Sequence, residues 1–129
     1  MATISNFEDL EIWQLARQQA VEVYQLYIIE PFSRDWELKN QINAASGSVM
    51  DNIAEGFERS GNKEFLNFLL IAKGSNGQVR SQLYRAFDRK YITEEKFDEL
   101  KNKCLTISKK ITSFIKYLKD SEKKGFRYS

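Results

Sequence analysis

The sequence has no histidine, one cysteine, one proline and only six glycines. Without histidine there is no imidazole general base, no Ser-His-Asp triad and no histidine-containing zinc site. The single cysteine, Cys104, excludes a disulfide within the chain and a metal site of several cysteines. An all-β fold with many turns normally needs more proline and glycine. We therefore expect no catalytic residues, no metal site and no cofactor.

Long apolar runs are also missing. The longest, from Phe65 to Ala72, is interrupted by Asn67 and ends at Lys73, whereas a membrane span needs about 20 apolar residues. The first residues contain neither a basic stretch nor the long apolar run of a secretory signal. We expect no membrane partner and a cytoplasmic location, with which one unpaired cysteine is consistent.

What the sequence does contain is enough apolar side chain for a core. It has 129 residues, of which 42% are hydrophobic and 29% charged. This length suits one domain, and this composition argues against disorder. We expect a single domain over residues 1–129, with a polar tail, residues 123–129, that frays.

Apolar residues recur at helical spacing in four segments. The first segment starts near Ser5 or Asn6, where Glu8 would complete a capping box, and stops before Pro31. The other three are expected at about 36–59, from 62 or 63 to about 90, and from 94 onward, with Thr93 as an N-cap. Short connections make successive helices antiparallel, which predicts an all-α, up-down-up-down four-helix bundle.

The last helix has the most regular repeat, with alternating steps of three and four residues. Its members are Phe97, Leu100, Cys104, Ile107, Ile111, Phe114 and Leu118. Cys104 lies on this repeat and is interpreted as a small core residue, with a reactive thiol as the alternative.

Four glycines fall inside the helical patterns, although each costs about 1 kcal/mol relative to alanine. They are Gly47, Gly56, Gly74 and Gly77. Close approach of another backbone is our interpretation, and ligand binding is the alternative.

Polar side chains lie beside the expected core stripe of the second helix. A buried amide or carboxylate must be hydrogen-bonded or paired. We predict an internal network that fixes the register of the helices rather than a functional polar site. Its expected members are Asn52, Glu55, Arg59, Lys63 and Lys73.

Charge is distributed unevenly, although the net charge is only +2. Residues 1–60 carry 4 basic and 10 acidic side chains, residues 61–100 carry 7 and 6, and residues 101–129 carry 9 and 2. This asymmetry occurs on faces that bind polyanions, but a solvated helix surface is the more common reason for it.

The basic side chains of the third and fourth helices, interspersed with tyrosines, suit phosphate contacts and base stacking. Ordinary surface lysine is the alternative explanation. The candidate nucleic-acid-binding residues are Arg80, Arg85, Arg89, Lys109, Lys110 and Lys116.

Several blocks of the sequence, in this order and spacing, resemble the 23S rRNA-intervening-sequence proteins. The resemblance covers roughly residues 7–118. Its most specific blocks are Asn52-Ile53-Ala54-Glu55-Gly56 and Ile71-Ala72-Lys73-Gly74-Ser75, supported by Gln41-Ile42, Ser81-Gln82-Leu83 and Trp13-Gln14-Leu15-Ala16.

The resemblance implies a small helical bundle that assembles into a ring-like homopentamer and has no known catalytic activity. Relatives serve as accessory proteins of diversity-generating retroelements, where they bind nucleic acid and a reverse transcriptase. This sequence departs from the family at Asn43-Ala44, where the family usually has arginines, and at Gln78, where it usually has an acid.

Three hypotheses follow from the sequence. The first is a non-catalytic oligomer that binds RNA or DNA through a basic surface, with RNA, DNA and a reverse transcriptase as its expected partners. The second is a protein-interaction or structural oligomer with no nucleic-acid role. The third, an enzyme, has no supporting motif.

Overall fold

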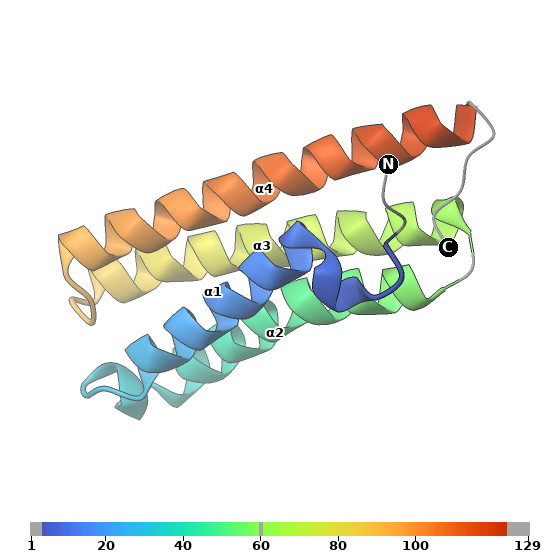
Figure 1. Ribbon diagram of the computed structural model, residues 1–129. Helices are drawn as coiled ribbons and strands as arrows, with labels where there is room; N and C mark the ends of the chain where they lie inside the picture. The colour runs from blue at the N-terminus through green and yellow to red at the C-terminus, as the bar shows by residue number, and fades with distance from the viewer. Residues whose placement is uncertain (1–3, 60, 124–129) are drawn as a thin grey trace.

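The computed structural model describes residues 4–59 and 61–123. Four α-helices account for most of them, and the described residues contain no strand. The helices are α1 (Glu11–Tyr27), α2 (Trp36–Glu58), α3 (Asn62–Asp88) and α4 (Glu94–Lys123). Consecutive helices run in opposite directions (Figure 1). The prediction of an all-α four-helix bundle is confirmed.

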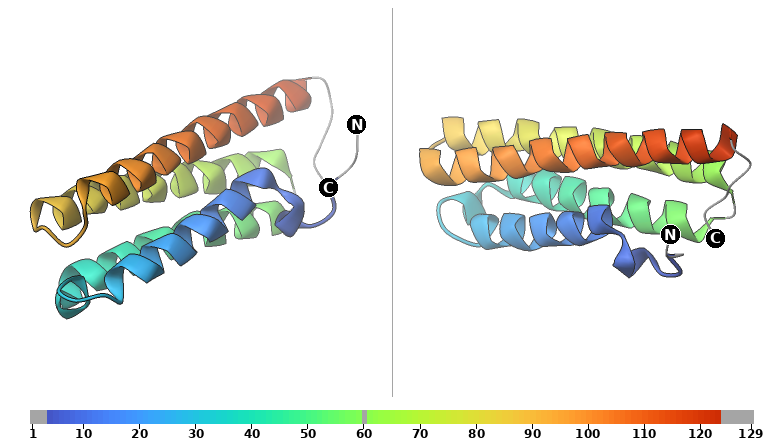
Figure 2. Two further views of the ribbon diagram at one scale, coloured as in Figure 1. Left: turned by 60° about the vertical axis from the view of Figure 1, so that its left-hand side comes forward. Right: turned by 45° about the horizontal axis from the view of Figure 1, so that its top comes forward.

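The four helices form two layers. α1 lies beside α2, α4 lies beside α3, and the two pairs face each other (Figure 2). The layers meet most closely where α2 packs on α3, whereas α1 and α4 pack least closely of the neighbouring helices. α1 is therefore diagonal to α3, and α2 is diagonal to α4.

The start of the first helix differs from the sequence-based expectation. Residues Phe7–Asp9 form only a 3-10 turn, η1, and Asn6 makes no side-chain capping bond. Leu10 is extended (φ −75°, ψ 126°) and only 1% exposed, so the chain bends to place this side chain in the core. The helix begins at Glu11, and the predicted capping box is wrong. The helix also ends early, at Tyr27, before a second 3-10 turn, η2 (Phe32–Arg34).

The other helix bounds agree with the sequence pattern to within a few residues, and two caps explain where helices begin. The Leu38 amide donates to the Asp35 carboxylate at 3.1 Å at the start of α2. The Lys96 amide donates to the Thr93 hydroxyl at 3.1 Å, which confirms Thr93 as the cap of α4. Lys123, where a frayed tail was expected to begin, is the last residue of α4, and residues 124–129 lie outside the described part.

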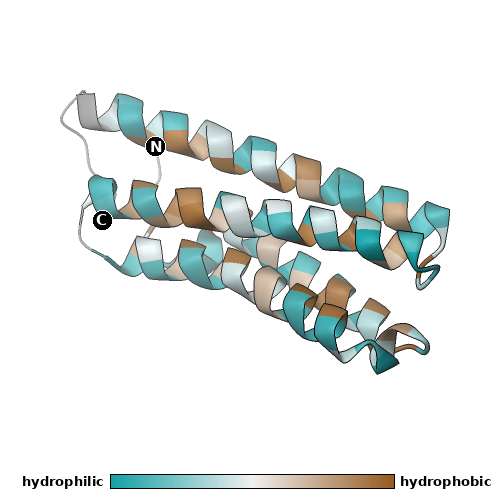
Figure 3. Cartoon of the chain, turned by 180° about the vertical axis from the view of Figure 1, so that it is seen from behind, coloured by the Kyte–Doolittle hydropathy of each residue, from teal (hydrophilic) through white to brown (hydrophobic). Residues whose placement is uncertain are grey.

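The core runs along the whole bundle. Of the predicted repeat on α4, all members are buried except Phe114, which is partly buried and packs on the core. Each helix carries both hydrophobic and hydrophilic residues along its length (Figure 3). None of the described helices is long and apolar enough to cross a membrane.

The glycines divide into two groups. A Cβ at Gly56 would lie 2.7 Å from the Phe68 Cβ, so α2 and α3 approach closely there. At Gly47, Gly74 and Gly77 a Cβ would meet nothing within 4 Å. At these three positions the expected close approach of a backbone does not come from a described helix of the same chain, because the glycines face open space.

Candidate functional site

Opposite charges separate between the two layers of the bundle. Residues 4–59, which form the α1–α2 layer, carry 4 basic and 10 acidic side chains, a net charge of −6. Residues 61–123, which form the α3–α4 layer, carry 14 basic and 8 acidic side chains, a net charge of +6. The small net charge of the chain therefore conceals one acidic and one basic side.

The basic layer has a long stretch without carboxylates. Residues 65–87 of α3 and 100–119 of α4 contain no Asp or Glu, but they carry nine Lys and Arg residues. The two stretches lie side by side, because Asn76 of α3 donates to the Cys104 carbonyl of α4 at 2.8 Å and Tyr84 packs edge-on against Phe97 at 4.8 Å. Carboxylates reach this surface from α1 and α2 and from the start of α4, where Asp98 lies 3.8 Å from Lys101 and Glu99 lies 3.7 Å from Lys103.

Three of the six predicted nucleic-acid-binding residues are engaged in contacts with such groups. Arg85 donates to the Gln41 amide oxygen at 2.6 Å and lies 3.6 Å from the Glu37 carboxylate. The Lys110 ammonium lies 3.0 Å from the Glu11 carboxylate. The third, Arg89, is bound by an acid at the end of the bundle.

Asp35 is that acid, and it links the two connections at this end. Its Oδ2 atom accepts hydrogen bonds from Tyr91 at 2.8 Å and from Arg89 at 2.6 Å. The Tyr91 bond, the Leu38 amide and then Arg89 hold the pKa of Asp35 below its ordinary value. The same carboxylate raises the pKa of Tyr91 and of Arg89. Arg89 is therefore engaged with Asp35 in this structure, and its predicted role in nucleic-acid binding stays a prediction.

The other three predicted residues have no ion pair or hydrogen bond within the described part of the chain. Lys109 and Lys116 are exposed on α4, whereas Arg80 is partly buried on the flank of α3 that faces α4. These side chains are available to an external anion. The structure thus divides the predicted set into three available and three engaged cations.

The predicted polar network is not a single network. Asn52 donates to the carbonyl and the hydroxyl of Ser48 at 2.8 and 2.9 Å, and the Ser48 hydroxyl lies 2.9 Å from that of Ser75 on α3. Arg59 pairs with Glu55 at 2.8 Å and lies 3.7 Å from Glu64.

The other predicted members do not join the hydrogen bonds of Asn52, Ser48 and Ser75. The Arg59–Glu55 pair is about half exposed, so it does not fix the register of a core. Neither Lys63 nor Lys73 has an ion pair with a described residue. The prediction of one buried network through all five residues is wrong.

A buried polar cluster that the sequence reasoning missed joins α1, α3 and α4. Gln19 is 4% exposed, and its amide nitrogen lies 2.9 Å from the Asn76 amide oxygen and 3.3 Å from the Cys104 sulfur. Burial raises the pKa of the Cys104 thiol to about 11, against a smaller opposing effect of Gln19 and Arg80. The available signal was Gln19 itself, a polar residue at a core position between Ala16 and Val23. Cys104 is a core residue, as its place on the repeat predicts.

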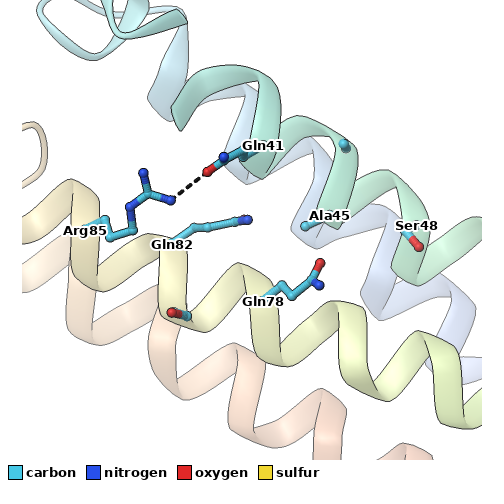
Figure 4. Close-up of a pocket in the computed structure, with 8 residues that line it drawn as sticks. Gln41, Ala45, Ser48, Gln78, Gln82 and Arg85 are labelled. Atoms are coloured by element: carbon cyan, nitrogen blue, oxygen red, sulfur yellow. Dashed lines mark hydrogen bonds between the residues drawn. The ribbon is translucent and has the colours of Figure 1, made fainter. Parts of the chain in front are cut away.

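Two open grooves border α3. The groove toward α2 holds about 570 Å³ and is lined by amide and small side chains, including Gln41, Ala45, Ser48, Gln78 and Gln82. Figure 4 shows Gln41 and Arg85 pointing toward each other across its end. The groove toward α4 has a mixed lining that includes one exposed apolar side chain: Leu70, Lys73, Gly74, Asn76, Gly77, Arg80 and Ser108. Among the described residues no group of three acidic or cysteine side chains is arranged to hold a metal ion.

Comparison with known proteins agrees with this architecture. A family model described as 23S rRNA-intervening sequence protein matches residues 8–113. A crystal structure of a protein of unknown function from the S23 ribosomal protein family of Bacteroides thetaiotaomicron superimposes with a TM-score of 0.74. It is 24% identical and covers 81% of this chain and 98% of its own, and at that identity it shows the fold alone. No curated protein matches.

Proposed function

The chain belongs to the 23S rRNA-intervening sequence protein family, and on that basis we propose that it is a non-catalytic, oligomeric accessory protein that binds RNA or DNA. The binding surface is the basic α3–α4 layer. The proposal also includes a reverse transcriptase as protein partner and a cytoplasmic location. The family and its solved relative are themselves of unknown function.

The observation that supports the proposal most is the stretch without carboxylates on α3 and α4. Cations gathered on one face attract phosphates over a distance, and each neutralised phosphate releases counterions. Nine cations lie on these two adjacent stretches with no acid among them, and five of the nine have no ion pair with a described residue. A merely solvated surface normally mixes both signs of charge.

The three cations without a protein partner are the ones that contribute to nucleic-acid binding. Arg80, Lys109 and Lys116 have no protein partner to give up, whereas Arg85, Arg89 and Lys110 would first have to leave Gln41, Asp35 and Glu11. The sequence has no base-reading motif, so contacts to phosphate dominate and discrimination between sequences is weak.

The test is a binding titration with duplex DNA, single-stranded DNA and a structured RNA at low and moderate salt. We expect affinity to fall steeply with salt, and Lys109→Gln with Lys116→Gln to weaken binding to all three probes alike. Each lost phosphate contact lowers the salt slope by about 1. The control is Arg34→Gln, which removes one exposed cation of the acidic layer and should leave binding unchanged. Failure of the unaltered protein to bind any probe at low salt contradicts the proposal.

The oligomeric part rests on α1. Val21, Tyr24 and Ile28 are at least half exposed and follow one another at steps of three and four residues, so they line its outward face. A bundle that stood alone would not keep such a stripe in water.

We propose a homopentamer on the strength of the family resemblance. Light scattering measures the mass directly. Val21→Lys combined with Ile28→Lys should dissociate the assembly without changing the helical content, because neither side chain is in the core. A monomeric unaltered protein at micromolar concentration contradicts this part. Nucleic-acid binding is tested separately, by the titration described above.

A further inference from the structure

Two partly buried cations lie on the same side of α3 and have no protein partner among the described residues. Lys73 and Arg80 both face α4, are both partly shielded from water, and have no ion pair or hydrogen bond with a described residue. Removing a cation from water is unfavourable unless an anion or several acceptors replace the water. Two such groups in one groove indicate that the groove is shaped for an anion.

The groove between them is open down to the helix backbone. Gly74 and Gly77 line it, and a Cβ at either position would meet nothing within 4 Å. Each glycine destabilises the middle of a helix by about 1 kcal/mol, and no packing against a described residue requires either of them. The missing side chains leave room for a ligand to approach α3 closely.

The other wall of the groove is polar and rigid. Ser108 of α4 contributes a hydroxyl that can donate a hydrogen bond. The floor is Asn76, which is 2% exposed and is held by Gln19 and the Cys104 carbonyl. Because these contacts fix Asn76, the spacing between the two walls is set before any ligand arrives.

We propose that this groove seats the phosphodiester backbone of one nucleic-acid strand. Lys73 and Arg80 each bind a phosphate, and Ser108 donates to a phosphate oxygen between them. Arg80 follows Lys73 by seven positions, a rise of about 10 Å along α3, so the two cations can reach different phosphates of one strand. This inference rests on the proposed function and identifies the atoms that carry it.

A phosphodiester fits the groove better than a carboxylate from another copy of the chain. No acid lies on the adjoining stretches of α3 and α4, and the free lysines Lys109 and Lys116 extend the positive surface beyond the groove. A strand with a charge at every step uses this whole surface, whereas one carboxylate would use a single cation.

The test separates a shaped groove from a diffuse positive field. The probe is a fluorescein-labelled oligothymidylate, titrated at several salt concentrations. Lys73→Gln with Arg80→Gln removes the two cations and should lower the salt slope by about 2, one for each phosphate contact. Gly77→Leu fills the groove and removes no charge, and it should weaken binding by about tenfold or more, as expected for loss of charge-assisted hydrogen bonds.

Arg17→Gln is the matched control, because it removes one exposed cation from α1 in the acidic layer. It should bind the probe like the unaltered protein. Circular dichroism and light scattering on every variant show whether folding and mass are preserved. If Gly77→Leu does not fold, Gly74→Leu fills the same groove without removing a charge.

Several outcomes overturn the inference. If the groove variants bind normally while Lys109→Gln with Lys116→Gln binds weakly, the groove does not bind the phosphodiester backbone. The proposed function then still stands. If Gly77→Leu changes the mass of the assembly, the groove is a contact between copies. If the unaltered protein binds no oligothymidylate, duplex DNA or RNA at low salt, the inference and the proposed function fail together.

Discussion

The Tyr91 hydroxyl donates a hydrogen bond of 2.8 Å to the Asp35 carboxylate, across 56 positions of the sequence. The contact joins the connection between α1 and α2 to the connection between α3 and α4. It is possible because the chain turns sharply after α3, where Lys90 has a φ of 62° and the Tyr91 amide donates to the Ala86 carbonyl at 2.9 Å. One carboxylate thereby caps a helix and ties the two layers together at one end.

Removing this carboxylate should destabilise the bundle. Asp35→Ala deletes the cap of α2 and leaves Tyr91 and Arg89 without their acceptor, so we expect the free energy of unfolding to fall by about 1–3 kcal/mol. Urea denaturation followed by circular dichroism measures the change. Asp51→Ala, at an exposed position of α2, is the control and should stay within about 0.5 kcal/mol of the unaltered protein.

The same cluster predicts how stability depends on pH. The pKa of Asp35 is lowered from 3.8 in the folded state. Its stabilising contribution is therefore complete above pH 3.8 and is lost as the pH falls through the lower, folded value. The pKa of Tyr91 is raised from 10.0, so its contribution is complete below pH 10.0 and is lost as the pH rises through the folded value.

Comparison of denaturation midpoints across pH tests both signs. Asp35→Asn should remove part of the acid dependence, and Tyr91→Phe part of the alkaline dependence. An acid limb of equal steepness in Asp35→Asn and the unaltered protein would show that other carboxylates account for it.

Alanine substitution should distinguish the two groups of glycines. Gly56→Ala places a Cβ against Phe68, and such overpacking commonly costs about 1–3 kcal/mol. Gly47→Ala meets open space and should stabilise the helix by up to about 1 kcal/mol. Melting temperatures that shift in opposite directions are the expected result. A loss of stability in Gly47→Ala would mean that another copy of the chain packs there.

Cys104 should be inert in the native protein. The side chain is 1% exposed, and burial raises the pKa of the thiol to about 11, so little thiolate exists at neutral pH. A thiol reagent should react slowly in buffer and rapidly in urea. Leu105→Cys in a Cys104→Ala background supplies a matched exposed thiol, since Leu105 is 38% exposed. Equal native rates for the two thiols would contradict the burial of Cys104.

The sequence predicted those features that depend on local periodicity. The repeat from Phe97 to Leu118 placed the core face of α4 correctly, because a helix buries residues at regular steps whatever it packs against. The start of α1 was wrong because the burial of Leu10 depends on a core formed by distant helices. The capping signal at Asn6 was local, and tertiary packing outweighed it.

The candidate site was predictable only as a charge pattern. Which cations are engaged depends on partners far along the chain, such as Glu11 for Lys110 across 99 positions. The spacing of residues within one helix does not predict which distant residues will pair with them. Gln19 and Asn76 were missed for the same reason, since each looks like an isolated polar residue until α1, α3 and α4 are brought together.

The opposite charges of the two layers also affect how the molecule is oriented as it approaches a polyanion. A formal net charge of +2 gives the molecule little overall attraction to a polyanion. Net charges of −6 and +6 on facing layers give it an electric dipole across its short axis. In the field of a polyanion a single bundle experiences a torque that turns α3 and α4 toward the polyanion before contact. The bundle would thus arrive already oriented, and added salt would slow its capture by screening this rotation as well as by weakening the final contacts.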